Sequence, residues 1–457
     1  RSKVLTVAYL GLIIFIFSFE LARKKDTKFD FLSLFHLFFI LLYPLPGFFI
    51  TSLAGNYEIF DPNVIRLSVY DIQYSIQVPL AIFTTYFLVI FGYYSPSALK
   101  YGSIVNITPR SNTIFWIITV GILFLGLFAV AIYTAQYGGL VQAIADANFI
   151  RSGSVKRQAL GFFIRLVYFN FFAAYLIASW LFIKQNQRKN LVLWLLFTLV
   201  MISSLISAFL VSARATMILA LSNFYLAYIL YRRKVALPVL IPVLIAIALF
   251  IVYGKILFYS LSGFSKGGYI EFVSRFQQAS GQSNEEGSFI TSLVKVFSYG
   301  FTSLYAASKE YYPLRLLGDW LYGIGSFLPD KLMRVDVPDT VSTNNTIYLA
   351  GNTDYEIPAG FIASCIYSWS WVGVVIFSFA YGWIGRYLQT ILYRHLYKIF
   401  WVPFLYAAIA QAWCDFLASG DPRIFLQANF CLLVSLIFLL MFGVKISVNK
   451  NLSSEAF

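Results

Sequence analysis

Residues 112–134 read NTIFWIITVGILFLGLFAVAIYT, a run of 23 residues without a charged side chain. An α-helix of about 20 mostly apolar residues is long enough to cross the hydrocarbon core of a bilayer. The whole chain of 457 residues has a similar character, with 60% hydrophobic and 12% charged residues. Soluble domains contain roughly 45–50% apolar and about 25% charged residues. We therefore expect an integral membrane protein.

Similar apolar stretches recur along the chain and predict about eleven transmembrane helices. The boundary between the sixth and seventh is the least distinct, because Ser212-Ala213-Arg214 leaves almost no loop. The predicted fold is an all-α polytopic membrane protein, with a single integral membrane domain over residues 1–457. The predicted spans are residues 4–22, 31–53, 76–96, 112–134, 159–183, 191–210, 214–231, 236–254, 358–384, 399–418 and 425–444.

The orientation follows from Lys and Arg, which concentrate in the short cytoplasmic loops of membrane proteins. With eleven spans, the basic clusters fall on one side, which is then cytoplasmic, with the N-terminus outside. The formal net charge of +14 therefore arises largely from these predicted cytoplasmic loops. Because the loops account for it, we expect no nucleic-acid partner. The clusters are Arg23, Lys24, Lys25 and Lys28; Lys100 and Arg110; Lys184, Arg188 and Lys189; Arg232, Arg233 and Lys234; Arg386, Arg394 and Lys398; and Lys445 and Lys450.

Two predicted extracytoplasmic segments are long. Residues 135–158 suggest a turn at Gly138-Gly139 followed by a short amphipathic helix. Residues 255–357 are too polar to span a membrane and too aromatic for a free linker. In this large loop we expect short amphipathic helices that lie on the membrane surface, with aromatic side chains at the level of the headgroups.

Several kinds of site have no signature in the sequence. It contains no glycine-rich phosphate loop, no zinc motif and no Asp-x-Asp pair. We therefore expect neither a metal nor another cofactor. The predicted spans carry few carboxylates, with only Glu20 and Asp415 inside them. This disfavours a proton pump, because pumps place carboxylates at membrane depth.

Basic residues also occur near the predicted outer face, where the charge bias of membrane proteins disfavours them. Guanidinium groups bind phosphate oxygens bidentately, so an anionic ligand at this surface would compensate their charge. Simpler interpretations are snorkelling to lipid headgroups, ion pairs within the bundle and solvated loop charges. The candidate binding residues are Arg214, Arg165, Arg151, Arg157, Lys255, Arg275 and Arg423.

Two carboxylates precede the ninth predicted span, in the stretch Asn352-Thr353-Asp354-Tyr355-Glu356. Partial burial at the membrane interface would raise the pKa of either carboxyl group and suit it to general base catalysis. Glu356 and Asp354 are the catalytic candidates. The alternative is that both residues cap the following helix, since acidic side chains favour a helix N-terminus.

Short motifs between residues 135 and 430 resemble, in their order, those of the bacterial Wzy-type oligosaccharide repeat-unit polymerases. That family builds O-antigen, enterobacterial common antigen and capsular chains. Two features depart from related patterns: no histidine lies in the outer loops, unlike in the similar O-antigen ligases, and Arg151 is not followed by a glycine at the spacing of some polymerase loops. The motifs are Tyr137-Gly138-Gly139-Leu140, Arg151-Ser152-Gly153, Ser212-Ala213-Arg214-Ala215-Thr216, Ser326-Phe327-Leu328-Pro329, Ile357-Pro358-Ala359-Gly360, Trp371-Val372-Gly373 and Gly420-Asp421-Pro422-Arg423.

The resemblance implies a GT-C-like glycosyltransferase of the bacterial cytoplasmic (inner) membrane, with its active site facing the periplasm or exterior. Its substrates would be glycans linked to undecaprenyl pyrophosphate, joined by metal-independent, inverting glycosyl transfer. The resemblance also implies membrane lipids and a chain-length regulator as partners. Two alternatives remain open at this point: an O-antigen ligase-like glycan transferase, and a flippase or transporter of lipid-linked oligosaccharides.

Overall fold

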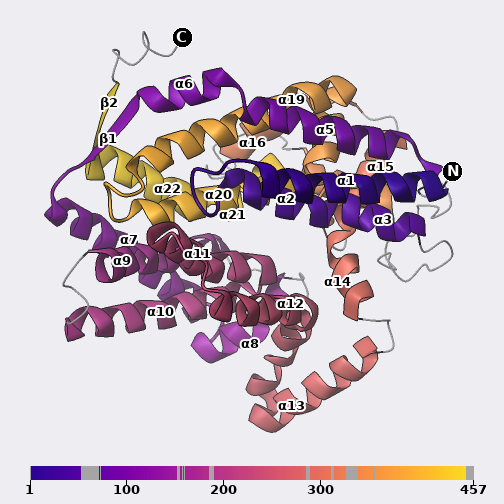
Figure 1. The fold of residues 1–457 in the computed structure, drawn as a ribbon. Helices are drawn as coiled ribbons and strands as arrows, with labels where there is room; N and C mark the ends of the chain where they lie inside the picture. Colours follow the sequence, from indigo (N-terminus) through magenta and orange to yellow (C-terminus); the bar gives the residue numbers. More distant parts are fainter. Residues whose placement is uncertain are drawn as a thin grey trace.

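The computed structural model describes residues 2–52, 72, 74–151, 155–156, 158, 160–184, 190–284, 289–309, 313–325, 338–353 and 356–448. Helices dominate this part of the chain (Figure 1). Within it, eight helices are long and apolar enough to cross a membrane, or up to ten spans if each of two bent helix pairs counts as one. The prediction of an all-α polytopic membrane protein is confirmed at this level, whereas the count of eleven is not.

The predicted spans and the observed helices coincide closely. The eight candidate spans are α1 (Ser2–Ala22), α2 with α3 (Phe31–Leu42 and Pro44–Ser52), α7 (Asn112–Ala135), the 3₁₀ turn Gly161–Arg165 with α9 (Phe169–Ile183), α10 (Leu191–Val211), α12 (Leu237–Ser260), α19 (Phe361–His395) and α20 (Val402–Ser419). The bent pairs are α5 (Gln77–Tyr93) with α6 (Pro96–Ile104), and α21 (Pro422–Ala428) with α22 (Phe430–Phe438) and its extension to Gly443.

The remaining predicted span, residues 214–231, forms α11 (Arg214–Arg232). This helix is not among the candidate spans that the described residues contain. Polar residues such as Asn223, which is fully buried, lower its hydropathy. A helix of this kind depends on neighbouring helices rather than on lipid, and α11 packs against α20.

The helices form two groups that lie one above the other in Figure 1. In the upper group, α19 packs along α5 and α6, and α2 packs against α20. Gly92 and Gly382 let α5 and α19 approach closely, because a Cβ atom at either position would meet the backbone of the other helix. In the lower group, α9 packs against α7 and α10, and the contact of α11 with α20 joins the two groups.

One small sheet accompanies the helices. This sheet was not predicted from the sequence. Strands β1 (Val105–Pro109) and β2 (Val444–Val448) pair antiparallel, with Val105 opposite Val448. The sheet connects the end of α6 to the chain beyond α22. It therefore ties together two segments that both map to the predicted cytoplasmic side.

The first long loop contains the predicted turn and a helix after it, but this helix is not amphipathic, since Ala145 is buried on the face opposite to Ala143. Gly138 and Gly139 have φ angles of 81° and 111° and form the turn after α7. The next helix, α8 (Leu140–Arg151), buries Ala143, Ala147 and Ile150.

The large loop contains several short helices, but one of them does not lie at a surface. α15 (Tyr299–Lys309) is buried from Gly300 to Ala307 and packs against α2, α5 and α19. Small residues at several positions of α15 allow this insertion into the bundle. Within the described residues, the other helices of the loop are α13 (Gly263–Asn284), α14 (Phe289–Phe297), α16 (Gly318–Gly325) and α18 (Val341–Ala350).

Two motifs that are distant in the sequence meet at Gly360 and Gly420. The N–H of Gly360 donates to the carbonyl of Ser419 at 3.2 Å. A Cβ atom at Gly420 would collide with the backbone of Gly360, and both glycines have positive φ angles, 72° and 61°. This contact fixes the start of α19 against the start of α21.

We predict that Gly420→Ala destabilises the protein strongly. A left-handed backbone alone costs an alanine about 1–2 kcal/mol, and the collision with Gly360 adds to this. The melting temperature of the purified protein in detergent measures the effect. Gly121→Ala is the control, since a Cβ atom there would have nothing within 4 Å. Equal melting temperatures for the two variants would contradict the proposed contact.

Candidate functional site

The break between α10 and α11 brings two of the predicted arginines together. α10 ends at Val211, and Ser212 adopts a left-handed conformation with φ 53°. The carbonyl of Ser212 accepts a hydrogen bond from Nη1 of Arg151, which ends α8. Arg214 starts α11 and donates through its own Nη1 to the carbonyl of Ile251 in α12. Gly254 provides room for this side chain, because a Cβ atom there would lie 2.9 Å from Cδ of Arg214.

These two arginines are not neutralised within the described residues. Their positive charges are close enough to repel each other, with Arg151 exposed and Arg214 partly buried. In the described part of the chain, both donate to carbonyl groups and neither forms an ion pair with a carboxylate. Two neighbouring cations repel each other, and an anion bound between them would remove this repulsion. We call Arg151 and Arg214 the arginine pair.

Three further predicted residues lie in the same group of helices as the arginine pair. Arg165 ends the 3₁₀ turn before α9; its side chain is exposed, and its carbonyl accepts from Sγ of Cys431 at 3.1 Å. Lys255 is exposed on α12, directly after Gly254. Arg275 on α13 donates to Glu271 at 2.8 Å and to Ser262 at 2.6 Å, so its charge is already compensated.

The remaining predicted residues lie elsewhere. Arg157 and Asp354 are outside the described residues. Glu356 accepts a hydrogen bond from Thr343 of α18 at 3.2 Å, and its side chain is exposed rather than partly buried as expected for a general base. Arg423 lies in the first turn of α21, in the other group of helices, and it contacts residues that were not selected from the sequence.

Arg423 shares one carboxylate with Arg315. Asp319 in α16 accepts from Nε and Nη2 of Arg315 at 2.7 and 2.8 Å, and from Nη2 of Arg423 at 3.3 Å. Both arginines also donate to the carbonyl of Asp339. Burial opposes the charge of Arg315, but the hydrogen bonds and charge of Asp319 outweigh it and raise the pKa of this guanidinium.

A second aspartate balances the charge of this cluster. Asp421 is fully buried and accepts from the backbone N–H groups of Arg423 at 2.9 Å, Ile424 at 3.3 Å and Ser342 at 3.0 Å. It therefore caps the N-terminus of α21 and also holds the first turn of α18, as acidic residues at helix N-termini do. With two arginines and two aspartates, the cluster has no net charge.

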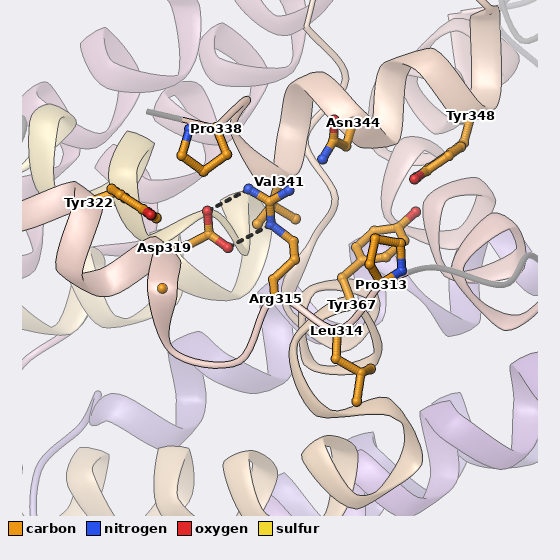
Figure 2. A pocket seen from close by; sticks show the side chains of 11 residues that line it. Pro313, Leu314, Arg315, Asp319, Tyr322, Pro338, Val341, Asn344, Tyr348 and Tyr367 are labelled. Carbon is orange, nitrogen blue, oxygen red and sulfur yellow. Dashed lines mark hydrogen bonds and ion pairs between the residues drawn. The ribbon is translucent and has the colours of Figure 1, made fainter. Parts of the chain in front are cut away.

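A cavity of about 190 Å³ opens beside this cluster. Figure 2 shows the guanidinium of Arg315 between the carboxylate of Asp319 and the side chain of Asn344. Tyr322 and Pro338 lie on one side of the cavity, and Tyr348 and Tyr367 on the other. We call this the tyrosine cavity.

The break in α19 holds one wall of the tyrosine cavity. Trp369 and Ser370 leave the helical conformation, and Ser370 has φ 56°. The carbonyls of Tyr367 and Ser368 are thereby free to accept the N–H groups of Arg315 and Leu316, both at 3.0 Å. Because of these bonds, the chain that carries Arg315 is fixed to the broken helix.

A buried polar network holds α18, which also lines the cavity. Asn345 donates to Ser303 at 2.9 Å and to the carbonyl of Ile357 at 3.1 Å, and accepts from Tyr367 at 2.9 Å. These bonds of Asn345 anchor α18. Val341, Asn344 and Tyr348, at positions i, i+3 and i+7, share one face of the helix and line the cavity.

Arg315 and Asp319 were not among the candidate residues predicted from the sequence. Their i,i+4 spacing, typical of a helical ion pair, was the available signal. No family model, curated protein or solved structure matches the chain.

We predict that Asp319→Ala destabilises the protein by about 3–5 kcal/mol, because it leaves two arginines without their shared buried carboxylate. Glu271→Ala is a matched control. It breaks the ion pair between Glu271 and Arg275, in which the side chain of Glu271 is 40% exposed. Exposed ion pairs contribute about 0–1 kcal/mol to stability. Unfolding in detergent, followed by tryptophan fluorescence, measures both. If Asp319→Ala lowers the free energy of unfolding no more than Glu271→Ala does, the shared carboxylate does not stabilise the structure.

Proposed function

We propose that the protein is a membrane glycosyltransferase that polymerises oligosaccharide repeat units linked to undecaprenyl pyrophosphate. In this proposal the N-terminus is extracytoplasmic, and the arginine pair lies at the outer face of a bacterial cytoplasmic membrane. The observation that carries the proposal is the arginine pair, whose two neighbouring cations lack a carboxylate partner among the described residues. A lipid diphosphate supplies the missing negative charge.

The reaction needs stabilisation of a leaving diphosphate. A hydroxyl of the acceptor sugar attacks the anomeric carbon of the donor glycan, a new glycosidic C–O bond forms, and the bond to the diphosphate oxygen breaks. Negative charge then grows on the lipid pyrophosphate, which the guanidinium groups of Arg151 and Arg214 stabilise. Direct displacement inverts the anomeric configuration.

A carboxylate must accept the proton of the attacking hydroxyl. Glu356 and Asp354 are the candidates that the sequence offers for this base. Glu356 lies beside α18, which lines the tyrosine cavity, rather than beside the arginine pair. The attacked anomeric carbon is bonded directly to the diphosphate, so the base must act beside the arginine pair. In this position Glu356 does not meet that requirement, and Asp354 is outside the described residues.

The remaining predicted cations fit this proposal in different ways. Lys255 is exposed in the same group of helices as the arginine pair, so it is available to the diphosphate or to lipid headgroups. Arg165 is also exposed in this group. Arg275 and Arg423 are paired with Glu271 and Asp319. We therefore assign these two a structural role.

We predict that Arg214→Ala abolishes long glycan chains in cells that express the protein normally. Loss of one such donor costs about 2.7–4 kcal/mol in activation free energy, or about 10²–10³ in rate. Arg232→Ala, at the other end of the same helix, is the control and should leave chain length unchanged. Gel analysis of the glycan measures the effect. Wild-type chain length in Arg214→Ala would refute the proposal.

Reconstitution separates polymerisation from the flippase alternative. Purified protein in liposomes receives lipid-linked repeat units as the sole glycan. We expect longer lipid-linked glycans to form, in an amount reduced about 10²-fold or more by Arg151→Ala. Translocation of unchanged repeat units without elongation would instead identify a flippase.

A further inference from the structure

The tyrosine cavity is too small for an entire lipid-linked oligosaccharide. Sites that enclose a whole small-molecule ligand measure roughly 300–1,000 Å³, whereas this cavity has about 190 Å³. It opens to the surface beside residues 313–325 and α18. A ligand that enters it would therefore insert one compact group and leave its remainder outside.

The charge of the cluster beside the cavity disfavours a phosphate or diphosphate. Asp319 and Asp421 balance Arg315 and Arg423. The carboxylate of Asp319, with 4% of its side chain exposed, lies directly between the two guanidinium groups. A multiply charged anion would be repelled by this carboxylate, and buried like charges are unfavourable. An uncharged polar group does not meet this repulsion.

The walls of the cavity nevertheless offer hydrogen-bonding groups. Nη1 of Arg315, the side-chain amide of Asn344 and the hydroxyl of Tyr322 have no hydrogen-bond partner among the described residues. An amide both donates and accepts, and a tyrosine hydroxyl does the same. Such a set matches a ligand that carries several hydroxyl groups.

Tyrosine rings supply the apolar part of the lining. Tyr322, Tyr348 and Tyr367 line the cavity, and the rings of Tyr348 and Tyr367 lie 6.2 Å apart between centroids. Aromatic rings bury apolar surface when a ligand packs on them, whereas the hydroxyl of Tyr367 is already bonded to Asn345. A pyranose ring combines C–H faces with hydroxyl edges.

We propose that the tyrosine cavity is a binding subsite for a single uncharged sugar ring, recognised by Asn344, Tyr322 and Nη1 of Arg315. This inference rests on the proposed function for its biological meaning, because the ring would belong to the glycan of the lipid-linked substrate. The subsite is separate from the arginine pair, which belongs to the other group of helices (Figure 1).

Saturation-transfer NMR with the full-length protein in nanodiscs tests the subsite. The probes are glucose, galactose, mannose and N-acetylglucosamine, with glucuronate and inorganic pyrophosphate as charged comparisons. We expect at least one neutral sugar to bind and the pyrophosphate not to displace it. Asn344→Ala and Tyr322→Phe should each weaken binding about fivefold, the value of one neutral hydrogen bond.

Matched variants serve as controls. Asn112→Ala removes an exposed asparagine at the start of α7, and Tyr228→Phe removes the hydroxyl of a tyrosine that is 43% exposed on α11. Neither should change sugar binding. The subsite is overturned if no neutral sugar binds, if Asn344→Ala and Tyr322→Phe bind as tightly as the wild type, or if pyrophosphate displaces the sugar.

Arg214→Ala distinguishes failure of the subsite from failure of the proposed function. We expect this variant to keep sugar binding and to lose long glycan chains. If both are kept, the polymerase proposal fails and the sugar subsite stands. If Asn344→Ala leaves sugar binding intact while Arg214→Ala loses the chains, the subsite fails and the polymerase proposal stands.

Discussion

Backbone groups that are freed where a helix breaks must find hydrogen-bond partners, because lipid offers none. Three breaks in this protein illustrate the constraint. The chain turns at Ser212 between α10 and α11, unwinds at Trp369-Ser370 inside α19, and turns again at Gly420 before α21. At each of these breaks, residues from a distant part of the sequence supply the partner. The candidate sites lie at these junctions.

The same constraint produces two different electrostatic environments. At the first break, Arg151 donates to the freed carbonyl of Ser212, and no carboxylate accompanies it among the described residues. At the second and third breaks, the freed groups bond to the backbone around Arg315 and to Gly360, and buried aspartates balance the nearby arginines. The first environment favours an anion and the second an uncharged polar ligand. Diphosphate and glycan are the two chemical parts of a lipid-linked oligosaccharide.

Hydropathy predicted most of the helices, because a spanning helix needs only length and apolar composition. The turn at Gly138-Gly139 and the presence of a helix after it could also be predicted, but the amphipathic character expected of this helix was wrong. Arg151 and Arg214 were detected because they oppose the expected charge bias. Their proximity could not be predicted, since it depends on the left-handed conformation of Ser212, which a serine rarely adopts.

The tyrosine cavity could not be predicted, for a related reason. Arg315, Asp319 and Arg423 are ordinary loop or cap residues in the sequence, and the bonds that assemble them start from a break at Ser370, again without a glycine. Burial of α15 was missed because small residues in a polar loop resemble a surface helix. Pairing of β1 with β2 joins segments too distant for any local pattern to reveal.

The affinity of the purified protein for undecaprenyl pyrophosphate, compared with undecaprenyl monophosphate, tests the central claim most directly. Native mass spectrometry from nanodiscs measures both lipids with the wild type and with the Arg151→Ala, Arg214→Ala double variant. We expect the wild type to prefer the diphosphate and the double variant to lose that preference. Equal affinity of the wild type for the two lipids, or an unchanged preference in the double variant, would show that the arginine pair does not bind a lipid diphosphate.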